Sequence, residues 1–223
     1  MTKYGIKQFD FSPWDFSYFT TQSTKELESW TNQVRPFGFI LKTGDFFQVN
    51  LLQSYDRLDN KFDLTDSAII PIGKYHMHNT EFQLGSYQRR RLWTQLLYNY
   101  GTFYTGIIQT FGTQIGINIS SHFNLNTTYT YNSINLPNSH VRSNELAQHI
   151  NYAFTTKLDI ALFAQWNSLN DFLFGNLRLH WIPKIGTDLY VVYNRGYERL
   201  KKLDLLKPQT STGIAKLVWR FTF

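Results

Sequence analysis

Apolar and polar residues alternate at every second position over most of this chain. In the segment 123–132, asparagine and threonine alternate with Phe123, Leu125, Thr127, Tyr129 and Tyr131. Successive side chains of a β-strand point to opposite faces, so this pattern predicts strands with one apolar and one polar face. Apolar residues at helical spacing are rare in the chain. The sequence therefore predicts an all-β protein.

The alternation, together with the turn-forming residues that interrupt it, predicts about twelve strands. We expect them at 12–19, 25–42, 45–56, 73–86, 91–101, 103–119, 122–133, 145–155, 157–167, 173–183, 187–195 and 213–223. These segments form one β-domain over residues 1–223, in which residues 1–24 are a poorly defined N-terminal segment.

The expected connections alternate between long and short. Residues 57–72, 134–144 and 196–212 form long links, and the links between them are shorter, with one departure at residue 102. Outer-membrane barrels have this alternation, because short turns lie at one end and longer loops at the other. A soluble sandwich with Greek-key crossings has no reason to sort its loops in this way. The pattern predicts an antiparallel up-and-down transmembrane β-barrel of about twelve strands, or the C-terminal part of a larger barrel.

The composition agrees with strands that separate lipid from water. Charged residues make up 17% of the chain, against about 25% in ordinary soluble domains. Aromatic residues make up another 17%, and the mean hydropathy is nevertheless −0.35. A sheet in lipid can be apolar outside and polar inside, which explains both values. The longest apolar runs, such as Ile160–Ala164, are far shorter than the roughly 20 residues of a membrane helix.

Several classes of protein are excluded or disfavoured. The chain has no cysteine, which excludes disulfide frameworks and thiolate metal sites. Its net charge is +6, but the basic residues are scattered, so we expect no nucleic-acid partner. The segment after Met1 lacks the apolar stretch of a signal peptide. We expect no cofactor.

The two faces of the predicted strands define two sets of candidate residues. The apolar positions are expected to face lipid or to form the aromatic girdles at its borders: Tyr129, Tyr131, Leu177, Leu179, Trp181, Leu217, Trp219 and Phe221. The basic residues at polar positions are expected to line the interior: Lys74, His76, His78, Arg178, His180, Lys216 and Arg220. Their field would favour anions. Alternatively, they pair with acids such as Glu81, Asp159 and Asp188, and the sequence leaves both readings open.

Candidate chemistry is sparse. His76 and His78 are two residues apart and could offer two imidazoles to a metal, but no third ligand accompanies them. His140 and Glu145 lie in an expected loop with Ser139 and Ser143 and contain the residue types of a hydrolase. Loops contain such residues by chance, so we predict neither a metal site nor an enzyme.

Several motifs carry a family resemblance. FYTG at 103–106, YNSINLP at 131–137, FAQWNS at 163–168, NLRLHWIPKIGTDLYVVYNRG at 176–196 and the closing LVWRFTF resemble the C-terminal β-barrel of domain-of-unknown-function family 5916. The resemblance extends from about residue 45 to the end. The terminal aromatic Phe223, on an amphipathic strand, also resembles the signal by which outer-membrane barrels are recognised for assembly.

The resemblance implies an outer-membrane barrel of a Gram-negative bacterium. Longer members of the family carry a secreted N-terminal domain similar to family-nine carbohydrate-binding modules, and neither that domain nor a signal peptide is in this sequence. We therefore expect a piece of a longer protein, a split gene or a shortened variant. Its expected partners are outer-membrane lipid, the barrel-assembly machinery and an upstream domain or companion chain.

Three hypotheses for the function follow. The first is a non-enzymatic barrel module that acts as an anchor, pore or export scaffold, linked to glycan handling through a domain absent from this chain. The second is an outer-membrane barrel hydrolase that acts on lipid or glycan. The third is a soluble β-sandwich that binds a ligand. Apolar residues exposed on one face would make the first two depend on detergent or lipid.

Overall fold

Every regular element of the computed structural model is a β-strand. The structure describes residues 5–22, 25–200 and 205–220, and in these ranges no helix is long and apolar enough to cross a membrane. The strands are β1 (Ile6–Phe9), β2 (Ser12–Thr20), β3 (Leu27–Leu41), β4 (Phe46–Leu58), β5 (Phe62–Thr65), β6 (Ala68–Ile70), β7 (Gly73–Gly85), β8 (Leu92–Phe103), β9 (Gly106–Asn118), β10 (Phe123–Leu136), β11 (Ser139–Thr155), β12 (Leu158–Asn167), β13 (Phe172–Lys184), β14 (Thr187–Leu200) and β15 (Leu205–Trp219).

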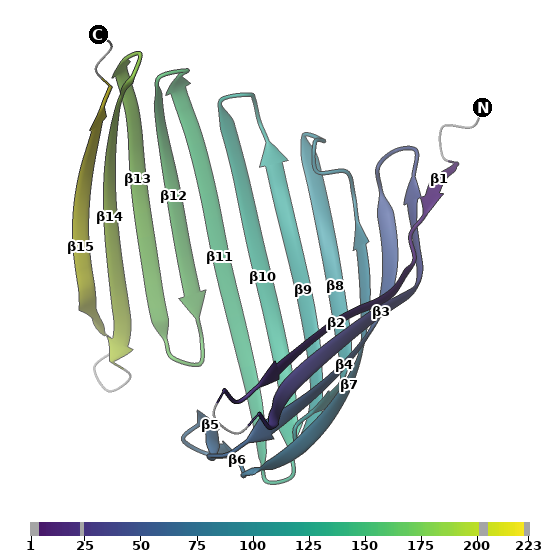
Figure 1. Cartoon of the computed structure of the whole chain (residues 1–223). Helices are drawn as coiled ribbons and strands as arrows, with labels where there is room; N and C mark the ends of the chain where they lie inside the picture. The colour runs from purple at the N-terminus through teal and green to yellow at the C-terminus, as the bar shows by residue number, and fades with distance from the viewer. Residues whose placement is uncertain (1–4, 23–24, 201–204, 221–223) are drawn as a thin grey trace. The chain divides into compact units, whose positions relative to one another are not determined.

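The strands form one large antiparallel sheet and a small hairpin. The large sheet has 13 strands in the order β1-β3-β4-β7-β8-β9-β10-β11-β12-β13-β14-β15, with β2 paired to β3. From β7 onward each strand is hydrogen-bonded to the next strand in the chain, as the ribbon shows (Figure 1). The remaining strands, β5 and β6, pair with each other. The predicted all-β, antiparallel up-and-down topology is therefore confirmed.

Two of the predicted long links are wrong. Residues 134–144 lie mostly in β10 and β11, which leave only Pro137 and Asn138 between them. The link 196–212 is replaced over its described residues by extensions of β14 and β15. A β-bulge at Gly196 and Tyr197 shifts the register of that pair and hides the alternation in the sequence. The expected alternation of long and short loops is accordingly weaker than predicted.

The chain divides into two compact units whose boundaries cross the middle strands. The first unit contains residues Met1–Tyr87, Thr94–Thr113 and Thr130–Ser143. The second contains Gln88–Trp93, Gln114–Tyr129 and Asn144–Phe223. Each unit has its own network of contacts, and we describe each by itself.

The first unit contains an interrupted edge strand. β1 pairs with the second half of β3 and β2 with the first half. At the break, the amide of Asp10 donates a hydrogen bond of 2.9 Å to the carbonyl of Gly38. A Cβ at position 38 would lie 2.8 Å from the Asp10 carbonyl oxygen, so this close approach requires glycine. Residues 6–20 therefore form two strands, although the sequence left the segment 1–24 poorly defined.

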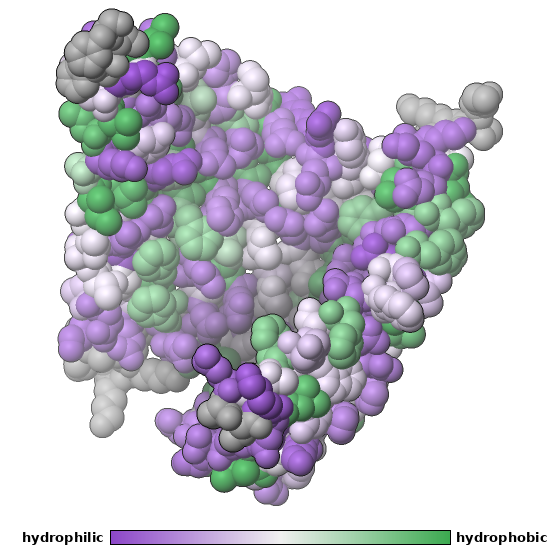
Figure 2. Space-filling view, in the orientation of Figure 1, coloured by the Kyte–Doolittle hydropathy of each residue, from purple (hydrophilic) through white to green (hydrophobic). Residues whose placement is uncertain are grey.

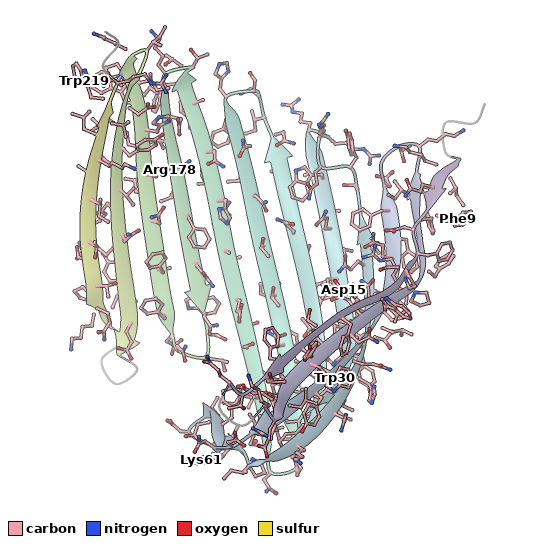
Figure 3. The ribbon with its side chains drawn as sticks, viewed as in Figure 1. Phe9, Asp15, Trp30, Lys61, Arg178 and Trp219 are labelled. Carbon is pink, nitrogen blue, oxygen red and sulfur yellow. The ribbon has the colours of Figure 1, made fainter. Side chains whose placement is uncertain are left out.

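The faces of the first unit differ in chemistry. β4 and β7 pair without interruption from Phe46 and Gly85 to Leu58 and Gly73. Large residues, about two-fifths or more exposed, occupy one face, and we call it the apolar face of the first unit: Phe37, Leu51, Phe82 and Leu84. The opposite, polar face carries Gln48, Asn50, Glu81 and Gln83. Hydrophobic residues also gather along β1 and β2, near Phe9 (Figures 2 and 3).

The second unit has the same two-faced arrangement. Cross-strand partners in β12–β15 place one set of apolar residues on a common face, the apolar face of the second unit: Ile160, Leu162, Leu177, Leu179, Trp181, Leu189, Val191, Tyr193 and Leu217. The opposite, polar face contains Asp159, Arg178, His180, Tyr190 and Lys216. Figure 2 shows hydrophilic and hydrophobic residues interspersed over β12–β15 on the side turned to the viewer.

Candidate functional site

The polar face of the second unit is built from rows of cross-strand neighbours. In one row, Asp159 of β12 pairs with His180 of β13, which pairs with Tyr190 of β14 and then Lys216 of β15. In the next row, Ala161 pairs with Arg178, Val192 and Ile214. Antiparallel partners project to the same face, so the register alone brings these residues together. Figure 3 labels Arg178 on β13.

His180 contacts three side chains on this face, those of Asp159, Asp188 and Tyr190. Its Nδ1 lies 3.0 Å from Oδ1 of Asp159, and its Nε2 lies 3.0 Å from Oδ1 of Asp188. The imidazole also stacks on the ring of Tyr190, with centroids 4.3 Å apart and planes within 2°. Of the two readings that the sequence left open for His180, the structure therefore shows the pairing with acids.

The other basic residues predicted for this face have more open surroundings. Arg178 and Lys216 are exposed and share the face of His180. Arg220 follows the end of β15, where its amide donates a hydrogen bond to the carbonyl of Gly186. Arg178, His180 and Lys216 thus lie on one face, opposite Leu177, Leu179 and Leu217.

Three predicted interior residues lie on the opposite side of β7 from the acid proposed as their partner. Lys74, His76 and His78 alternate in step with Phe82, whereas Glu81 projects to the other face. They therefore lie on the apolar face of the first unit, near its end, and not on its polar face as expected. His76 contacts the rings of Tyr55 and Trp30, with centroids 4.9 Å and 6.3 Å away. The reason for the error is that β7 is apolar at one end of this face and polar at the other.

Glu81 belongs instead to a polar network that the sequence analysis missed. Its Oε1 accepts hydrogen bonds from Asn50 and Gln83, and the oxygen of Asn50 accepts one from Arg35. Arg35 also forms an ion pair of 2.7 Å with Asp10. Asn50 is 1% exposed, and its bonds compensate for its burial. The contacts of Arg35 with Asn50 and Asp10, and of Asn50 with Glu81, join residues 15 to 31 positions apart, and only strand pairing brings them together.

Most of the predicted lipid-facing and girdle residues lie in described strands. Leu177, Leu179, Trp181 and Leu217 share the apolar face of the second unit. Tyr129 donates a hydrogen bond of 2.8 Å to Asn144 of β11. Tyr131 precedes Asn132, whose side chain is hydrogen-bonded to Thr110 and Ser143. Trp219 ends β15 under the ammonium of Lys184, 5.7 Å from the ring centroid (Figure 3). Phe221 and Phe223 lie outside the described residues.

The candidate hydrolase residues are engaged separately. Nδ1 of His140 contacts Oδ1 of Asn135, and its Nε2 accepts a hydrogen bond of 2.8 Å from Arg142. The hydroxyl of Ser143 accepts from Asn132, and Glu145 accepts from Asn167. Both nitrogens of the only candidate base are therefore occupied by groups other than a nucleophile. Among the described residues, no group of three His, Asp or Glu side chains is arranged to hold a metal ion.

Outside the strands, one turn holds an unusual tyrosine. Tyr104 follows β8, has φ of +49° and donates a hydrogen bond of 2.7 Å to Oδ2 of Asp56. Its ring packs edge-on against Tyr75, with centroids 5.1 Å apart. Burial, and then the bond to Asp56, raises the pKa of the Tyr104 phenol above its usual value. The turn is thereby tied to β4 and β7.

Comparisons with known proteins place few constraints on identity. No protein-family model matches the chain, and no curated protein matches it. A solved structure of the NanC porin in a rhombohedral crystal form is similar over 96% of this chain and 100% of its own, with 9% identity and a TM-score of 0.37.

Proposed function

We propose that this chain is an outer-membrane β-barrel module, or the C-terminal part of a larger one, that serves as an anchor, pore or export scaffold and has no catalytic activity. The observation that carries the proposal is the division of each unit into two faces. One face presents large exposed apolar side chains, such as Leu217 at 61% and Leu84 at 48%. The other face presents hydrogen-bonded polar groups.

Lipid is the environment that fits this division. A soluble protein rarely leaves so many large apolar side chains on one continuous strand surface, because they would associate in water. In a bilayer the same side chains contact acyl chains, and the backbone is satisfied by its neighbouring strands. The polar face then contacts water. A β-sandwich is less well supported, because apart from the short β5–β6 pair the described strands belong to a single sheet.

Further parts of the proposal rest on the sequence. The resemblance to the barrel of family 5916 supports a place in the outer membrane of a Gram-negative bacterium. It also supports insertion by the barrel-assembly machinery, with the C-terminal sequence that includes Phe223 as the recognised segment, and a connection to an upstream domain or companion chain. A hydrolase is not proposed, because His140 is held by Asn135 and Arg142.

The proposal is tested by the response of the 223-residue chain to lipid. The chain is refolded in the presence of phosphatidylcholine vesicles, floated on a density gradient and washed with alkaline carbonate. We expect it to stay with the vesicles and to resist added protease. A folded monomer that stays in solution without detergent would overturn the membrane assignment. A change in gel mobility between unboiled and boiled samples would further indicate that the chain closes a barrel by itself.

A further inference from the structure

Three phenylalanines lie on the polar face of the second unit, where the separation of lipid from water does not require them. Phe163 belongs to β12, and Phe172 and Phe174 belong to β13. Their positions alternate in step with Asn176, Arg178 and His180 and are opposite to Leu177 and Leu179. All three rings are partly exposed. They are therefore aromatic surfaces on the face that also carries Asp159, Arg178 and His180.

Each of these rings has a side-chain amide as its cross-strand partner. Phe163 pairs with Asn176, Phe174 with Gln165 and Phe172 with Asn167. The three pairs follow one another along β12 and β13, and ring and amide exchange strands after the first pair. The ring centroids of Phe163 and Phe174 are 6.4 Å apart, and His149 adds a further ring 4.5 Å from Phe163. Together the three pairs form a path of rings and amides, in which His149, Phe163 and Phe174 are in ring contact.

Among the described residues, two of the three amides on this path form side-chain hydrogen bonds, and the third does not. Asn176 donates to Oδ1 of Asn194, and Asn167 donates to Glu145. Gln165, which is exposed, has no side-chain hydrogen bond in the part of the chain that the structure describes. It lies directly across from Phe174 and two residues from Phe163 on the same face of β12. An amide placed in this way can bond a ligand without giving up an existing partner.

Few charged residues lie along the path. The rows of Phe163 and Phe174 contain His149, Asn176, Asn194, Gln165 and Gly196 but no carboxylate, lysine or arginine. Acids enter only in the row of Phe172, which contains Glu145 and Glu198, and Arg178 lies one row to the other side. A ligand that occupies the path therefore gains from stacking and hydrogen bonds, with little contribution from ion pairing.

We propose that this ring-and-amide path binds a neutral saccharide chain. A pyranose has an apolar C–H face that can lie on an aromatic ring, and hydroxyl groups at its edge that exchange hydrogen bonds with amides. Alternating rings and amides along two strands offer both contacts to successive sugar units. The inference rests on the proposed function and deepens it, because a saccharide can reach these residues only if the polar face of the second unit contacts water.

The test measures saccharide binding by the full chain in phosphatidylcholine nanodiscs. Maltohexaose and cellohexaose are the neutral probes, and an oligogalacturonate of equal length is the charged one, each titrated by isothermal calorimetry. The variant F163L/F174L keeps apolar volume but removes both ring faces, and Q165L removes the free amide. The matched control is F154L, because Phe154 is 52% exposed and packs edge-on against Tyr152, on the apolar face.

We expect at least one neutral hexasaccharide to bind. F163L/F174L should weaken its binding about tenfold or more, Q165L should weaken it less, and F154L should leave it unchanged. The proposal is overturned if neither neutral probe binds, if the oligogalacturonate binds equally well, or if F154L has the same effect as F163L/F174L. Vesicle flotation of the same samples measures membrane insertion separately. If the chain inserts into vesicles but binds no neutral saccharide, the saccharide proposal is wrong and the proposed membrane function is unaffected.

Discussion

The imidazole of His180 lies parallel to the phenol ring of Tyr190 on the neighbouring strand, with centroids 4.3 Å apart and planes within 2°. Each ring nitrogen faces a different carboxylate, Asp159 or Asp188, at 3.0 Å. One residue thus joins β12, β13 and β14 on the polar face of the second unit. Removing His180 would leave two carboxylates without this partner.

We therefore expect His180→Ala to destabilise the protein by about 1–2 kcal/mol, a value reduced from that of buried charged hydrogen bonds because both carboxylates are partly exposed. Urea unfolding in phosphatidylcholine vesicles measures the change. In H180A/D159N the two effects should be less than additive, because both substitutions remove the same contact. Full additivity would show that the contact contributes nothing.

Leu217 and Lys216 are neighbours on β15 that project to opposite faces. Leu217 is 61% exposed and pairs with Leu189, whereas Lys216 pairs with Tyr190. If the apolar face contacts the bilayer near its midplane, Leu217→Arg costs about 2–4 kcal/mol. Lys216→Gln is expected to cost little. The free energy of unfolding in vesicles, measured for both variants, tests which of the two residues faces lipid. Equal losses of stability in the two variants would contradict the assignment of the apolar face to lipid.

Gly38 and Gly213 provide a matched pair of alanine substitutions. A Cβ at position 38 would lie 2.8 Å from the carbonyl oxygen of Asp10, whereas a Cβ at 213 would meet nothing within 4 Å. Gly38→Ala should therefore destabilise the junction of β1 and β2 by about 1–3 kcal/mol. Hydrogen exchange of residues 6–20 should accelerate in this variant and not in Gly213→Ala. Equal exchange in both would argue against the close approach.

The phenol of Tyr104 gives a pH-dependent signal. Burial and the hydrogen bond to Asp56 raise its pKa, so the folded state favours the neutral phenol. Its contribution to stability is complete below the ordinary tyrosine pKa of about 10 and is lost as the pH rises above it toward the folded-state pKa. Absorbance titration of wild type against Tyr104→Phe should show one phenol that is still protonated at about pH 11. Ionisation of that phenol near pH 10 would contradict the contact with Asp56.

The strands were predictable because each is encoded locally. Eleven of the twelve expected segments from 12–19 to 187–195 overlap strands of the sheet closely, since alternation with period two is visible within any short window. The errors fall where the local signal is weak. The extensions of β10 and β11 flank a turn at Pro137 and Asn138, whose residue types suggest a longer loop. The extensions of β14 and β15 contain a bulge that interrupts the alternation.

The chemistry of the faces was only partly predictable. Arg178, His180 and Lys216 share one face, as the alternation with apolar neighbours in β13 and β15 indicates. Lys74, His76 and His78 were assigned to the polar face because the apolar Tyr75 and Met77 alternate with them, whereas Phe82 and Leu84 farther along β7 lie on the same face as the three basic residues. The pairing of Phe163 and Phe174 with amides is not visible in the sequence, since those amides come from neighbouring strands.

By itself, the sequence determined that the chain forms antiparallel strands with two unlike faces, because strand geometry turns a period of two into a division between apolar and polar sides. Only the tertiary structure decided which side chains meet. His180 with Asp159 and Asp188, Glu81 with Asn50, and Phe174 with Gln165 are joined by the register between strands. That register is set by the complete pattern of backbone hydrogen bonds and bulges across the sheet, which no local window of sequence contains.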